Sequence, residues 1–108
     1  MPLPPLSAGT FTVAVLPDTQ QYAAGNPAVF DAMTRWIAEH RDEQRIVFCS
    51  HVGDVVRHFD SPDEWAAIDV AMRRLDGIVP YGISVGNNDM DEPTGNASLF
   101  SRTFPPSR

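Results

Sequence analysis

The sequence has no lysine, one cysteine and no long apolar run. Its eight basic residues are all arginines, and the formal net charge is −6 over 108 residues. An acidic chain without a basic cluster is a poor partner for nucleic acid or an anionic membrane surface, so neither is expected. The single cysteine, Cys49, excludes an internal disulfide. Without about 18 consecutive apolar residues, no membrane-spanning helix is expected either.

The first nine residues are rich in proline and lack the basic and apolar regions of a signal peptide. We expect residues 1–9 to form an extended lead, and the sequence assigns no compartment. The chain as a whole is 43% hydrophobic and 20% charged, which is typical of a globular protein. Its length suits one small domain with one core.

Strand-like and helix-like segments alternate along the chain and predict an α/β fold. Runs rich in β-branched and aromatic residues, each ending in a polar turn, predict strands at 10–16, 46–50 and 80–85. Helices are expected from 26 to about 43 and from 61 to about 75. This alternation implies parallel strands joined by right-handed crossovers. The turn-rich remainder has at most a short helix around 96–100.

Both helices begin with strong N-terminal signals. Asn26 precedes Pro27, and Ser61-Pro62-Asp63-Glu64 combines a capping box with proline at the first helical position. One apolar stripe is expected on the first helix, from Val29, Met33, Trp36, Ile37 and His40. We expect His40 to be half-buried, and Trp36 and Trp65 to anchor the core.

Polar side chains follow each predicted strand. Asp18 and Gln20 come after the first, Asp54 after the second, and Asn87 and Asn88 after the third. The carboxyl ends of parallel strands share one edge of a sheet, where ligands bind. Carboxylate and amide oxygens suit hard divalent cations. Three such turns on one edge indicate a site more strongly than any one alone.

These turns resemble the first three motifs of calcineurin-like metallophosphoesterases. Asp18-Thr19-Gln20, Gly53-Asp54 and Gly86-Asn87-Asn88-Asp89 are similar to that family's Asp-x-His, Gly-Asp and Gly-Asn-His-Asp or Gly-Asn-His-Glu. The resemblance extends from Phe11 onward. It implies a parallel β-α-β-α-β unit, the N-terminal half of a four-layer α/β/β/α sandwich. Residues 10–108 are accordingly expected to form part of a metallophosphoesterase domain.

The resemblance also implies roles for individual residues. Two divalent metal ions (Mn, Fe or Zn) would be bound by four oxygen ligands: Asp18, Gln20, Asp54 and Asn87. Asp54 would bridge the two metals, and Asp89 would support the site. The implied reaction is hydrolysis of a phosphomonoester or phosphodiester substrate by a metal-activated hydroxide.

Two departures from the family pattern leave a second interpretation open. Asn88 stands at the position of the family's catalytic histidine, and a neutral amide donates a hydrogen bond but supplies no proton. The family's later motifs, an isolated histidine and Gly-His-x-His, are absent after Asp89. The chain is therefore expected to be an N-terminal portion with weak or no activity alone, or an inactive metal- or phosphate-binding relic. A phospho-receiver domain is disfavoured because it needs a lysine and an acidic pair.

Other polar residues lie near the expected site in the sequence. His51 is expected behind Asp54 as support, whereas a nucleophilic Cys49–His51 pair would lack an orienting group. Arg57 and His58 are close enough in sequence to line the pocket or meet a phosphate, although solvent exposure is the simpler interpretation. A three-stranded sheet also leaves exposed edges, through which self-association is expected.

Overall fold

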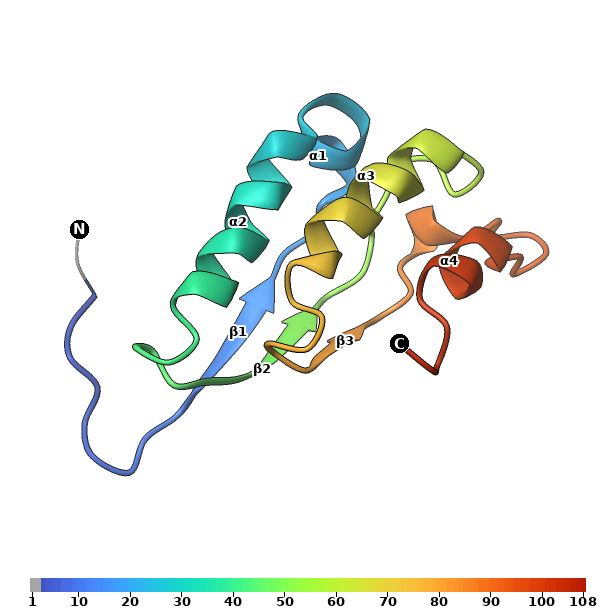
Figure 1. The fold of residues 1–108 in the computed structure, drawn as a ribbon. Helices are drawn as coiled ribbons and strands as arrows, with labels where there is room; N and C mark the ends of the chain where they lie inside the picture. Colours follow the sequence, from blue (N-terminus) through green and yellow to red (C-terminus); the bar gives the residue numbers. More distant parts are fainter. Residues whose placement is uncertain (1–2) are drawn as a thin grey trace.

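A computed structural model describes residues 3–108, so the predicted extended lead falls partly on Met1 and Pro2, outside the described residues. Residues 3–9 contain no helix or strand. Eight elements follow in chain order (Figure 1): β1 (Thr12–Leu16), α1 (Gln20–Gly25), α2 (Pro27–Glu39), β2 (Ile46–His51), α3 (Pro62–Arg73), β3 (Tyr81–Ile83), the 3-10 turn η1 (Asn87–Asp89) and α4 (Ser98–Thr103).

The three strands form one parallel sheet in the order β1-β2-β3, which confirms the α/β class. Leu16 pairs with His51, and His51 pairs with Ile83, so the last residues of all three strands lie in one row. The polar turns that follow them therefore leave the sheet at the same edge. β3 is shorter than the predicted 80–85 strand.

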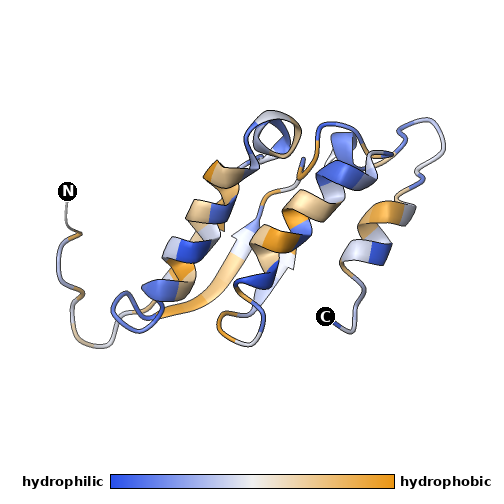
Figure 2. Ribbon diagram, turned by 45° about the horizontal axis from the view of Figure 1, so that its top comes forward, coloured by the Kyte–Doolittle hydropathy of each residue, from blue (hydrophilic) through white to orange (hydrophobic). Residues whose placement is uncertain are grey.

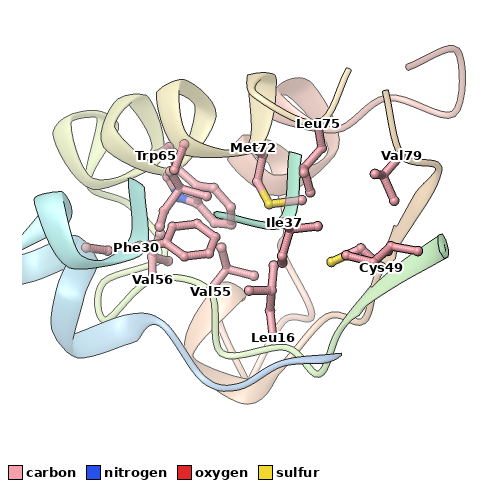
Figure 3. Close-up of a cluster of buried hydrophobic side chains, with 14 residues drawn as sticks. Leu16, Phe30, Ile37, Cys49, Val55, Val56, Trp65, Met72, Leu75 and Val79 are labelled. Carbon is pink, nitrogen blue, oxygen red and sulfur yellow. The ribbon is translucent and has the colours of Figure 1, made fainter. Parts of the chain in front are cut away.

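Helices α2 and α3 lie side by side over one face of the sheet (Figure 1). Buried side chains from these helices and the sheet meet in one core, where Leu16, Ile37 and Met72 are 6% exposed or less (Figure 3). The opposite face of β1 is open, with Val13 47% exposed and Val15 62% exposed. Apolar side chains thus occur on both sides of the sheet. The helices cover only one of these sides (Figure 2).

Helix α2 differs from the sequence prediction in its end and in its buried face. It ends at Glu39 rather than near residue 43, because turns carry the chain to Arg45, which has a φ of 50°. Its buried residues are Phe30, Thr34 and Ile37, a stripe rotated from the predicted one. Trp36 is 42% exposed and stacks on the half-buried His40, so the prediction of a core anchor at Trp36 was wrong.

Helix α3 begins as predicted, whereas α1 was missed. The Ser61 hydroxyl accepts a hydrogen bond from the Glu64 N–H at 3.3 Å, and Trp65 is 3% exposed, as expected of a core anchor. Residues 17–22 were predicted as a polar turn, but the segment 20–25 is helical because the Thr19 carbonyl accepts from the Ala23 N–H at 2.9 Å. Helix α4 begins slightly later than the short helix predicted around 96–100.

None of the helices within residues 3–108 combines the length and the apolar character needed to cross a membrane.

Candidate functional site

Asp54 lies in a tight turn directly after β2. Gly53 has a φ of 102° and Asp54 a φ of 52°, so two successive residues adopt left-handed conformations. Such a conformation is unfavourable for a residue with a Cβ and persists where surrounding contacts hold it. One contact is made by the carboxylate itself, because Asp54 Oδ1 accepts a hydrogen bond from the Asn88 N–H at 2.9 Å. The second and third polar turns are therefore joined through Asp54.

Gly86 allows this close approach. A Cβ at position 86 would overlap the backbone N and Oδ1 of Asp54 and lie only 2.7 Å from its Cγ. The φ of Gly86 is −91°, which any residue adopts, so glycine is needed here for space rather than for backbone freedom. The Gly-Asn-Asn-Asp segment thus has a steric reason to begin with glycine.

The first polar turn contacts both of the others. The Thr19 N–H donates to the Asp54 carbonyl at 3.2 Å, which ties the turn after β1 to the turn after β2. The Gln20 side-chain oxygen accepts a hydrogen bond from the Asn88 amide, which ties it to the turn after β3. The structure therefore brings Gln20, Asp54 and Asn88 together.

Asp18 and Asn87 lie at the exposed margin of this cluster. Asp18 precedes Thr19 in the chain and is exposed to solvent. The Asn87 amide nitrogen donates to Glu92 Oε1 at 3.1 Å and to Asn88 Oδ1 at 3.3 Å. These contacts engage the nitrogen and leave the Asn87 side-chain oxygen, the atom expected to bind a metal, for other partners.

Asp89 is buried beneath the cluster and holds two loops together. Its Oδ1 accepts from the backbone N–H groups of Val55 and Val56 at 2.8 and 3.0 Å, and its Oδ2 accepts from Gly86 at 2.9 Å. Burial raises the pKa of Asp89; the backbone hydrogen bonds oppose this shift, and the nearby Asp54 charge adds to it. Asp89 thus contacts backbone groups that position Asp54.

His51 is 1% exposed and binds the turn that carries Asp54. Its Nδ1 contacts the Gly53 N–H at 3.0 Å, and its Nε2 contacts Thr19 Oγ1 at 2.9 Å. Burial lowers its pKa to about 4. Cys49 lies on the same face of β2, and burial raises the pKa of its thiol to about 11. A buried neutral thiol and a histidine bonded elsewhere do not form a nucleophilic pair.

Arg57 and His58 are both exposed, as the simpler interpretation held. Arg57 Nη1 donates to Gln21 Oε1 at 3.4 Å, which places its guanidinium beside α1. His58 Nδ1 contacts Glu64 Oε2 at 2.7 Å. Glu64 also accepts from the backbone N–H groups of Arg57 and His58 at 2.8 and 3.2 Å.

Sequence analysis did not find the roles of Thr19 and Glu64. Thr19 stands at the variable middle position of the Asp-x-Gln motif, and a single threonine carries no chemical signal. Glu64 was recognised only as part of a capping box, and its carboxylate closes the preceding loop instead. Pairing of the strand ends was needed to see that Thr19 faces His51.

The oxygen atoms of this cluster belong to carboxylates and to side-chain amides. Within residues 3–108, no three His, Cys, Asp or Glu side chains gather closely enough to form a metal site by themselves. A groove of about 790 Å³ lies between β1 and α2, and its lining includes Val15, Met33 and Trp36 but no polar-turn residue. We therefore base the candidate site on the hydrogen-bonded turns and not on the groove.

Comparison with known proteins finds a similar chain. The sequence is 32% identical over 101 residues to the uncharacterized protein YvnB of Bacillus subtilis (strain 168), and the match covers 93% of this chain. It covers only 8% of YvnB, so this chain spans a small part of its relative's length. No family model matches the chain, and no solved structure matches it.

Proposed function

We propose that this chain carries the N-terminal part of a metal-dependent phosphoesterase site. The observation that supports it is the direct contact of all three polar turns around Asp54. Thr19 reaches the Asp54 carbonyl, Asn88 reaches its carboxylate, and Gln20 reaches the Asn88 side chain. Three turns that are distant in sequence thus meet around one residue, Asp54, as the resemblance to metallophosphoesterases leads us to expect.

The residues at this cluster suit hard cations. The proposed ligands are the carboxylates of Asp18 and Asp54 and the amide oxygens of Gln20 and Asn87. Asp54 uses Oδ1 for the Asn88 N–H, which leaves Oδ2 for a metal. Among Mn, Fe and Zn, an oxygen-only set favours Mn²⁺. When bound, divalent cations would activate water and neutralise charge on a phosphate ester.

Asn88 and Asp89 would have different roles toward a phosphate ester substrate. The Asn88 amide is bonded to Gln20 and, on release, is able to donate a hydrogen bond to a phosphoryl oxygen. It cannot protonate a leaving group, so the proposed hydrolysis lacks the general acid of the resembled family. Asp89, which binds three backbone N–H groups, would keep the loops around Asp54 in place.

We further propose that the sheet belongs to a four-layer α/β/β/α sandwich. The uncovered face supports this proposal, because Val13, Val15 and Phe48 are 47%, 62% and 38% exposed. Apolar side chains on an open sheet face gain free energy when a second layer covers them.

A metal- or phosphate-binding relic is the alternative, and the positions of the histidines favour it. His51 is buried, His58 is bonded to Glu64, and His40 stacks on Trp36. None of these three side chains is placed as a ligand beside Asp54. The chain then contributes oxygen ligands alone, which suffice for weak binding of a cation without turnover.

Hydrolysis of p-nitrophenyl phosphate and bis-p-nitrophenyl phosphate with Mn²⁺ tests the phosphoesterase proposal. The Asn88→His variant restores a proton donor and should raise Mn²⁺-dependent turnover by about 10²–10⁴-fold. Asn26→His, an exposed position outside the cluster, is the control and should leave turnover unchanged. Mn²⁺ binding without turnover in either protein would instead support the relic.

A further inference from the structure

Thr19 is the residue that connects the first polar turn to the second, and it does so entirely in the interior. Its side chain is fully buried. Its Oγ1 contacts the Val55 carbonyl at 2.9 Å and His51 Nε2 at 2.9 Å, while its N–H donates to the Asp54 carbonyl. A single residue beside Asp18 thus bonds to three residues around the Gly53–Asp54 turn.

The hydrogen positions in this network follow from its chemistry. The Gly53 N–H is always a donor, so His51 Nδ1 must accept and carries no proton. A neutral imidazole then has its proton on Nε2 and donates it to Thr19 Oγ1. The threonine hydroxyl in turn donates to the Val55 carbonyl, which only accepts. Each proton therefore has one place, and the direction of the chain is fixed.

The surroundings of His51 favour this neutral form. The ring of Phe30 packs edge-on against it at a centroid distance of 5.8 Å. Burial lowers the pKa of His51 to about 4, so the imidazole is neutral at pH 7. A protonated ring would place a hydrogen on Nδ1 against the Gly53 N–H, and the turn could not keep its present form.

This network holds the conformation that aims the Asp54 carboxylate. Asp54 has a φ of 52°, and the left-handed turn needs contacts from outside itself. Gly53 is bonded to His51, and the Asp54 carbonyl is bonded to Thr19. With both ends of the turn fixed, Asp54 Oδ1 meets the Asn88 N–H.

We propose that Thr19 and His51 act as a buried positioning pair, which sets the placement of the Asp18–Gln20 turn against Asp54 and thereby tunes cation binding without touching the cation. The cation-binding part of this inference rests on the proposed function. The alignment of the two turns is a property of the protein alone and is measured separately.

Thr19→Val removes the hydroxyl and keeps the shape of the side chain. Thr34→Val is the matched control, since Thr34 is also fully buried but bonds only to carbonyls of its own helix, α2. Calorimetric titration with Mn²⁺ should show a loss of affinity of about tenfold or more for T19V and of less than about twofold for T34V. Thr19→Ser, which keeps the hydroxyl, should restore most of the affinity. Equal Mn²⁺ affinities for T19V and T34V would overturn the inference.

Hydrogen exchange and NMR separate this inference from the proposed function. The backbone N–H of Asn88, which Thr19 does not touch, should exchange faster in T19V than in T34V at matched global stability. The reason is that its acceptor, the Asp54 carboxylate, is released in T19V. If wild-type protein binds no Mn²⁺, the proposed function fails, and this exchange rate still decides the positioning role. If T19V does not fold, the imidazole ¹⁵N shifts of wild-type His51 decide it. A proton on Nδ1 would contradict the pair, and a proton on Nε2 alone is the expected result.

Discussion

At the residue scale, the candidate site depends on an unusual backbone conformation of its central residue, Asp54. A left-handed φ at a residue with a Cβ costs about 1–3 kcal/mol, which other interactions must offset. The Thr19 N–H donates to the Asp54 carbonyl, and the Asn88 N–H donates to the Asp54 carboxylate. The neighbouring Gly53 is bonded to His51. The turn is therefore stabilised mainly by groups distant in sequence.

The buried His51 predicts a dependence of stability on pH. Its pKa falls from the usual 6.5 to about 4 on folding, so between these values the unfolded chain binds more protons. The contribution of neutral His51 to the free energy of unfolding should therefore be fully present above pH 6.5. It should fall as the pH drops toward 4, by on the order of 1 kcal/mol per pH unit. Urea denaturation at several pH values measures this slope.

His51→Gln, which does not titrate, is the comparison that isolates the effect. Burial also raises the pKa of Asp89, and that shift acts in the opposite direction on the slope. Subtracting the H51Q slope from the wild-type slope cancels the Asp89 contribution, which both proteins share, and leaves the contribution of His51. Identical slopes between pH 4.5 and 6.5 would contradict a buried neutral His51.

Single residues were predictable where they carry chemistry and not where they carry geometry. The sequence placed Asp54, Gln20 and Asn88 together, because each follows a strand and the strands are parallel. It could not show that Asp54 is left-handed, since that depends on a bond to Thr19 across 35 positions of the chain. It also placed Trp36 in the core, because the residue is large and apolar, yet Trp36 is 42% exposed.

At the scale of elements, the start of α3 closes the loop that follows Asp54. Ser61 caps the helix in the predicted manner. Glu64 turns away from the cap and binds residues 57 and 58 with both carboxylate oxygens. Desolvation raises the pKa of Glu64, but hydrogen bonds from His58 and from the backbone of residues 57 and 58 outweigh it, so the pKa lies below its usual value.

Replacement of this carboxylate should destabilise the protein more than replacement of its neighbour. Glu64→Gln and Asp63→Asn each remove one negative charge from the first turn of α3, so their effects on the helix dipole are similar. Only E64Q also weakens charge-assisted hydrogen bonds to the loop. Urea denaturation should show an additional loss of about 1–3 kcal/mol for E64Q over D63N. Equal losses would show that Glu64 acts only through the effect of its charge on the helix dipole and not through its hydrogen bonds to the loop.

Elements with strong local signals were predicted well, and elements set by tertiary contacts were not. Strand β2 and helix α3 have clear hydrophobic patterns and clear starts. Helix α1 is only six residues long and depends on Thr19, which the rest of the fold positions. The buried stripe of α2 includes Thr34, which a search for apolar residues passes over.

At the scale of the whole molecule, the sheet is covered by helices on one face and is open on the other. Val13 and Val15 on the open face are 47% and 62% exposed, and β1 and β3 are the two edges of the sheet within residues 3–108. The match to YvnB covers only 8% of that protein. The activity and substrate of a complete site are accordingly part of the proposal.

The architecture followed from the sequence at this scale because three strands and two long helices alternate in a simple order. The parallel sheet and the convergence of its strand ends were both predicted and confirmed. The second half of a four-layer sandwich stays a prediction, as does the pair of metals. A pair of metals needs more ligands than the oxygen atoms that this chain gathers around Asp54.

Titration of Mn²⁺ into the wild-type chain and into Asp54→Asn tests the central claim most directly. The asparagine keeps an oxygen for the Asn88 N–H and removes the negative charge that a cation needs. Asp42→Asn, an exposed carboxylate that pairs with Arg41 just before β2, is the control. We predict that wild-type protein and D42N bind Mn²⁺ alike and that D54N loses at least about tenfold in affinity. No binding by the wild-type protein, or equal binding by D54N, would contradict a metal site at Asp54.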